Sequence, residues 1–106
     1  MAWVVLVLAG LFEIGWAVGL KLSEGFTRFW PSAFTVVSMV VSLALLGVAM
    51  RSLPLGTAYA VWTGIGAVGT VAAGIAFFGD AASAGRLACV GLILAGIVGL
   101  KVFTPA

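Results

Sequence analysis

The chain has 106 residues, of which 64% are hydrophobic and only 8% are charged. A soluble domain of this size could not bury so much apolar surface, so the composition predicts an integral membrane protein. The formal net charge of +2 is too small to indicate nucleic-acid binding, and a chain with no histidine and one cysteine offers too few ligands for a transition-metal site. That cysteine, Cys89, lies in an apolar run and is interpreted as a packing residue.

The first apolar run, residues 2–22, has the length of about 20 residues that an α-helix needs to cross a bilayer, and Glu13 lies in its middle. A carboxylate at this depth costs several kcal/mol, so such residues usually face a helix-bundle interior or a wet cavity. The alternative is a permanently protonated Glu13 that only bonds a neighbouring helix. The run lacks the basic leading region of a signal peptide, so we expect it to be retained.

Glu13 shares one face of this expected helix with small and aromatic residues. Residues three and four positions apart lie on the same face. The face comprises Leu6, Ala9, Gly10, Glu13, Trp16, Ala17 and Leu20. Gly10 leaves room beside the carboxylate and Trp16 offers a ring, although Gly10 could equally serve close helix packing.

Three further apolar runs follow, at residues 31–51, 55–78 and 84–103. Backbone groups in lipid must bond internally, so all four runs are expected to be helices of a single transmembrane domain covering residues 1–106. The predicted fold class is therefore all-α. Because the links are short, consecutive helices should be antiparallel neighbours, and both termini should lie on one side of the membrane.

The basic residues are divided almost evenly between the two sides. Arg51, Lys101 and the amino terminus lie on one side, and Lys21, Arg28 and Arg86 on the other. The positive-inside rule therefore gives almost no preferred orientation. Either another feature sets the orientation, or the protein inserts both ways, which would allow an antiparallel homodimer.

The side chains of a four-helix bundle would fill its own centre, so a single chain is too small to enclose a cavity easily. Eight helices, from two copies of the chain, are expected to enclose one more readily. The fourth run carries small residues that predict a dimer surface, or else packing within the chain. They are Ala84, Ala88, Gly91, Ala95 and Gly99.

The second run places Thr35, Ser38 and Ser42 on one helical face. A serine in a membrane helix usually bonds a backbone carbonyl of its own helix. The functional interpretation is that Ser42 meets Glu13, which the spacing permits.

The third run places Tyr59, Trp62, Thr63 and Gly66 on one face. Tyr59 could be an interfacial anchor, whereas Trp62 is deeper in the run. Residues 64–69 match G-x-G-x-x-G, but a dinucleotide site needs that motif between a strand and a helix, so we reject a cofactor site here. The glycines are expected to thin or bend the helix.

Five segments together resemble the small multidrug resistance transporters. They are Phe12–Ala17, Leu20–Lys21, Gly25–Arg28, Pro31–Ser32 and Gly56–Gly66. The resemblance covers nearly the whole chain. Trp16 and Thr63 resemble the guanidinium exporters of this family, since the multidrug exporters typically have a small residue and a serine there. The stretch from Ser23 to Ser32 occurs in both subtypes, and Cys89 stands near a glycine expected in the dimer motif.

The resemblance implies a proton-coupled antiporter of guanidinium, multi-pass in the cytoplasmic membrane and working as an antiparallel homodimer, without a cofactor or enzymatic activity. It implies that Glu13 of both subunits binds substrate or protons in competition. The residues implied to line the site are Gly10, Trp16, Ser42, Tyr59 and Trp62. Lys101 also resembles a subtype feature, but no role follows for it.

Two alternatives stay open beside the guanidinium exporter. One is a multidrug exporter of bulkier lipophilic or quaternary ammonium cations, and Trp16 argues against it by narrowing the site. The other is a helical membrane protein that transports nothing and assembles with a partner, which would need no acid like Glu13 in mid-membrane.

Overall fold

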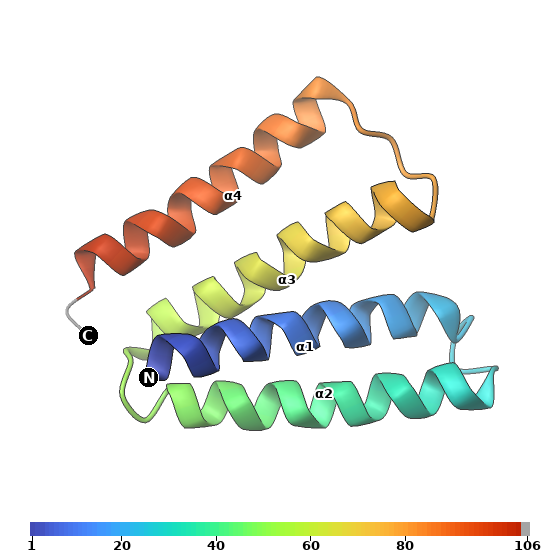
Figure 1. Cartoon of the computed structure of the whole chain (residues 1–106), viewed down its shortest axis with the longest axis horizontal. Coiled ribbons are helices and arrows are strands. Elements are labelled where there is room, and N and C mark those ends of the chain that lie inside the picture. The colour runs from blue at the N-terminus through green and yellow to red at the C-terminus, as the bar shows by residue number, and fades with distance from the viewer. Residues whose placement is uncertain (105–106) are drawn as a thin grey trace.

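The computed structural model describes residues 1–104, and they form four α-helices joined by short links (Figure 1). The helices are α1 (Ala2–Leu22), α2 (Phe29–Ala49), α3 (Leu55–Phe77) and α4 (Ala84–Phe103). Each is long and apolar enough to cross a membrane. The prediction of an all-α protein with four membrane-spanning helices is confirmed.

The ends of the helices follow local chemistry. α2 begins at Phe29 rather than at residue 31, because the first turn of a helix has unpaired N–H groups and therefore accepts Pro31. α2 ends at Ala49, whose carbonyl accepts the N–H of Leu53 at 3.1 Å as the chain turns. Pro54 then precedes the first residue of α3.

Three of the helices form a layer and the fourth diverges from it (Figure 1). α1 lies between α2 and α3 and packs along both, whereas α2 and α3 touch only briefly. α4 packs against part of α3 and meets α1 through Lys101 and Trp3, and none of its residues, all within the described part of the chain, is buried. The start of α1 and the end of α4 lie at the same end of the molecule, as short links predict.

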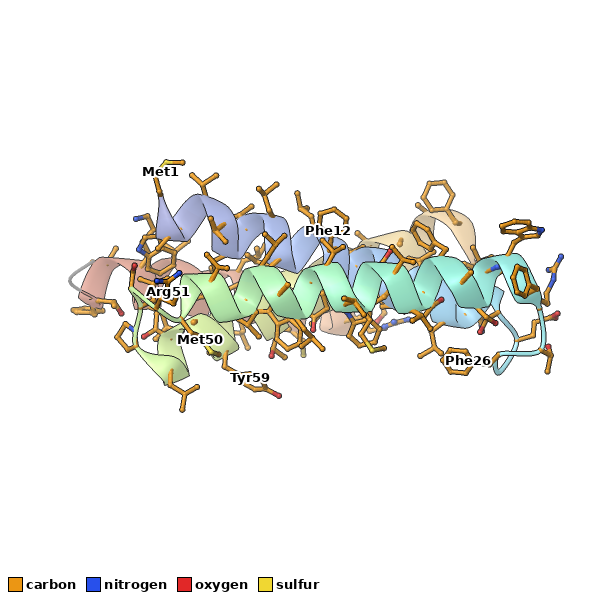
Figure 2. The ribbon with its side chains drawn as sticks, turned by 90° about the horizontal axis from the view of Figure 1, so that it is seen from below. Met1, Phe12, Phe26, Met50, Arg51 and Tyr59 are labelled. Atoms are coloured by element: carbon orange, nitrogen blue, oxygen red, sulfur yellow. The ribbon has the colours of Figure 1, made fainter. Side chains whose placement is uncertain are left out.

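The core lies in the half of the molecule nearest that end. Its buried apolar residues are Leu6, Ala9, Leu46, Ala49, Leu53, Ala58, Val61 and Trp62. Thr35, Ser38 and Ser42 are also buried, on the single face of α2 that the spacing predicted. Large side chains elsewhere project outward from the helices (Figure 2), as expected where lipid is the solvent.

Candidate functional site

Glu13 lies directly against the backbone of α3. Its carboxyl group packs on Gly66, so closely that a methyl group at Gly66 would overlap both Oε1 and Cδ of Glu13. The Glu13 side chain is partly buried, and its Oε1 atom is shielded from solvent with no hydrogen-bond partner among residues 1–104. A buried carboxylate oxygen without a donor is costly, so this atom is available to bind a donor from outside the chain.

The glycine run of α3 allows α1 and α4 to approach its backbone. Ile14 of α1 packs on Gly69 as Glu13 packs on Gly66. On the other side of α3, a Cβ at Gly64 would lie 2.9 Å from Cδ1 of Ile97 in α4. The run lies inside one uninterrupted helix. Because these glycines have no side chain, Glu13 and Ile14 of α1 and Ile97 of α4 can pack directly on the backbone of α3. The expected thinning of the helix thus makes room for these three side chains.

At Gly10 the roles of the two helices are reversed, because a side chain of α3 packs against a glycine of α1. A Cβ at Gly10 would lie 2.7 Å from the Cβ of Ile65, so α3 inserts Ile65 into the surface of α1 one turn before Glu13. Gly10 was expected either to leave room beside the Glu13 carboxyl group or to allow close helix packing. Within the single chain it allows close packing of α1 against α3. α1 and α3 interlock at Gly10–Ile65 and Glu13–Gly66, which fixes the height of the carboxyl group along α3.

Ser42 joins three helices through one hydroxyl group. Its Oγ donates to the carbonyl oxygen of Ala9 in α1 at 2.7 Å, and it accepts the indole N–H of Trp62 in α3 at 2.9 Å. The hydroxyl therefore bonds neither a carbonyl of its own helix nor Glu13. Thr35 does bond within its helix, to the carbonyl of Pro31 at 2.7 Å. Spacing alone could not separate these two outcomes.

The three aromatic residues expected in the site differ in their exposure and in their partners. Tyr59 and Trp62 are in contact, with ring centroids 5.7 Å apart and planes inclined by 49°. Trp62 is only 7% exposed, whereas Tyr59 is 55% exposed. Trp16 follows Glu13 by one turn, and its indole nitrogen is buried without a hydrogen-bond partner in the described part of the chain. The expected site residues thus fall into a Ser42–Trp62–Tyr59 group and a Gly10–Glu13–Trp16 face of α1.

The contact of Gly66 with Glu13 was not predicted from the sequence. Spacing places Gly66 on the face of Tyr59 and Trp62, and Gly66 was expected only to thin or bend the helix. The available signal was its position four residues, about one helical turn, after Trp62, on the face that carries two residues implied to line the site. Ile65, which packs into Gly10, carried no distinguishing signal because it is one apolar residue among many.

Four membrane-length helices, with an acid held between two of them, define a small polytopic membrane protein with an ionisable interior. Residues 1–93 match the family described as Small Multidrug Resistance protein. The chain belongs to the small multidrug resistance family, and it is a multi-pass transport protein of the cell membrane.

Several proteins to which the chain is similar are named guanidinium exporters. A protein of Citrobacter freundii with that name is 59% identical over 104 residues, covering 98% of this chain and 99% of its own. The guanidinium exporter of Yersinia pseudotuberculosis is 61% identical over 101 residues, covering 95% and 97%. That of Escherichia coli O6:H1 is 60% identical over 104 residues, covering 98% and 99%. The resemblance to this family and subtype is thereby confirmed.

Proposed function

We propose that the protein exports guanidinium across the cytoplasmic membrane in exchange for protons, with Glu13 binding both ions in turn. The observation that carries this proposal is the Glu13 carboxyl group itself, held against Gly66 with one buried oxygen unpaired. The names of relatives about 60% identical over nearly their whole length support guanidinium as the substrate.

Guanidinium matches the chemistry around Glu13. It is a planar cation with N–H groups along every edge, and it pairs with a carboxylate through two parallel hydrogen bonds. Trp16 and Trp62 offer aromatic faces to such a cation, and Tyr59 adds a ring and a hydroxyl group. Ser42 acts indirectly in this proposal, because its hydroxyl group orients the Trp62 ring.

Exchange follows if the two ions compete for one acid. A protonated Glu13 cannot pair with guanidinium, and a Glu13 that holds guanidinium has no free proton site. If the empty carrier cannot switch sides, guanidinium can leave only when protons enter. The carboxyl group thus accounts for coupling without a separate device.

We infer that the working unit is an antiparallel homodimer. α4 diverges from the other helices and buries none of its residues, all of them described, so a large apolar surface is free for a second copy. Lys and Arg residues are almost balanced between the two sides, which permits insertion in both orientations. In such a dimer, Glu13 of each subunit would face one shared site.

Transport by purified protein in liposomes tests the proposal. Under an imposed pH gradient, guanidinium should be exchanged for protons, and tetramethylammonium should be handled at least about tenfold less well. The reason is that tetramethylammonium has no N–H group, and each buried carboxylate oxygen left without a donor costs about 1–3 kcal/mol. Equal handling of the two ions would contradict the proposal and favour a multidrug exporter.

The Trp16→Gly variant tests what sets this selectivity. Removing the ring should widen the site, so that bulkier lipophilic cations are transported and the affinity for guanidinium falls. Trp30→Gly is the matched control, because Trp30 is 79% exposed at the start of α2 and should leave selectivity unchanged. An unaltered preference in Trp16→Gly would remove Trp16 from the site.

A further inference from the structure

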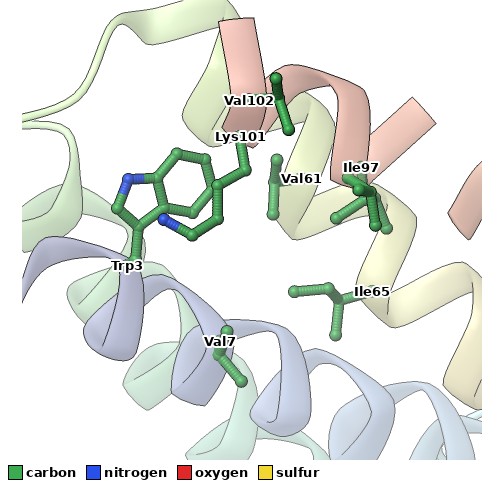
Figure 3. Close-up of a pocket in the computed structure, with 8 residues that line it drawn as sticks. Trp3, Val7, Val61, Ile65, Ile97, Lys101 and Val102 are labelled. Atoms are coloured by element: carbon green, nitrogen blue, oxygen red, sulfur yellow. The ribbon is translucent and has the colours of Figure 1, made fainter. Parts of the chain in front are cut away.

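A pocket of about 460 Å³ lies between α1, α3 and α4, one to two helical turns from the end of the molecule where the chain begins (Figure 3). Its walls are apolar and include Val7, Ile65, Ile97 and Val98. Val98 is 62% exposed, so the pocket is a groove that opens to the surroundings of the helices. The groove lies on the side of α3 that faces α4. Glu13 does not line it.

The mouth of this groove is formed by Trp3 and Lys101. The Lys101 ammonium lies over the Trp3 ring, 4.6 Å from the ring centroid (Figure 3). Trp3 is in the first turn of α1 and Lys101 in the last turn of α4. Tryptophan rings and lysine ammonium groups near helix ends lie at the level of lipid headgroups. Val7 and Ile97, one turn further in, then lie at the depth of the acyl chains.

Charges at this end of the molecule favour an anion. Lys101 lines the groove itself, whereas Arg51 and the amino group of Met1 lie at the same end of the molecule without lining it. The acidic side chains of residues 1–104 lie elsewhere, Glu13 midway along α1 and both Glu24 and Asp80 at the opposite end. The indole N–H of Trp3 is buried without an acceptor in the described structure. The mouth therefore supplies positive charge, and none of the acidic side chains of residues 1–104 lies beside it.

We propose that this groove binds an anionic phospholipid, with the phosphate group at Lys101 and one acyl chain along Val7, Ile65 and Val98. Basic pockets between transmembrane helices are a recognised way of binding anionic headgroups. The lipid would fill the space between α4 and α1, which are otherwise linked here by the Lys101–Trp3 contact. It would thereby fix the angle at which α4 diverges. A second copy of the chain is the competing occupant.

Native mass spectrometry of the whole protein tests the charge requirement. The protein is purified with equal amounts of phosphatidylglycerol and phosphatidylcholine. Wild type should retain phosphatidylglycerol preferentially, and Lys101→Gln should lower that retention about fivefold, the effect of one basic residue near a membrane surface. Lys101→Arg should restore it. Arg51→Gln, which removes a charge from the same end outside the groove, should change it little.

A second variant tests the groove itself and does not depend on Lys101. Val98→Trp keeps the ammonium group but fills the space for the acyl chain, so phosphatidylglycerol retention should again fall severalfold. Equal retention of both lipids by wild type, or equal losses in Lys101→Gln and Arg51→Gln, would overturn the proposal. So would a Lys101→Gln variant that keeps its lipid and loses dimer, since that result would assign the groove to a second copy.

Discussion

At the scale of single residues, the position of Glu13 depends on the absence of a side chain at Gly66. The carboxyl group occupies the space that a Cβ at Gly66 would need. Ile65 packing into Gly10 fixes the same pair of helices one turn away. The acid is therefore positioned by α3 as much as by its own helix, and a small change in α3 should alter transport.

Gly66→Ala is expected to impair transport while the protein still folds. The added methyl group must displace the Glu13 carboxyl group or separate α1 from α3, at a cost of about 1–3 kcal/mol. Guanidinium exchange should fall at least about tenfold. Gly47→Ala is the control, because a Cβ at Gly47 in α2 meets no atom within 4 Å. Normal exchange by Gly66→Ala would show that the contact does not position the acid.

The sequence could predict which residues face inward but not what they touch. The mid-membrane acid, the buried face of Thr35, Ser38 and Ser42, and the depth of Trp62 all followed from spacing and from the cost of polar groups in lipid. The partner of Ser42 did not follow, because helical periodicity defines a direction and not the neighbouring helix or its height. Neither did the contact of Glu13 with Gly66, which depends on how α1 and α3 interlock.

At the scale of helices, the bond from Ser42 to Ala9 and the bond from Trp62 to Ser42 tie α1, α2 and α3 together. α2 and α3 touch little by other means, so this hydroxyl group is the main polar link between them. Its loss would also leave the buried indole N–H of Trp62 without an acceptor, which costs about 1–3 kcal/mol.

A double-mutant cycle measures this link. Ser42→Ala and Trp62→Phe should each destabilise the protein, and the double variant should lose less than the sum, with a coupling energy of about 1 kcal/mol or more. The measurement is the free energy of unfolding in detergent. Thr35→Ala with Trp62→Phe is the control pair, since the hydroxyl of Thr35 bonds within α2. Additive losses for Ser42 and Trp62 would mean that the hydrogen bond contributes nothing.

Helix ends were predictable to within a turn, because lipid requires long apolar runs and the prolines lie near their ends. The divergence of α4 was not predictable. Its small residues favour close packing with any helix, and composition does not distinguish a helix of the same chain from one of a second copy. In the described part of the chain, a Cβ added at Gly91 or at Gly99 would have no atom within 4 Å, so these small residues are not used for packing there.

At the scale of the whole molecule, the even distribution of Lys and Arg predicts insertion in both orientations. Reporter tags after residue 106 should be found on both sides of the membrane in comparable amounts. Adding two or three Lys residues to the link between α1 and α2 should bias the chain toward one orientation. A wild-type chain with a single orientation would exclude an antiparallel dimer formed by dual insertion.

The most direct test of proton-coupled guanidinium export compares wild type with Glu13→Gln in liposomes. Glutamine keeps the shape of the glutamate side chain, but its amide group neither carries a negative charge nor binds a proton near neutral pH. Wild type should move protons when guanidinium is added and move guanidinium when a pH gradient is imposed, whereas Glu13→Gln should do neither although its helix content is unchanged. Proton-driven guanidinium exchange that persists in purified Glu13→Gln would contradict the role given to this acid.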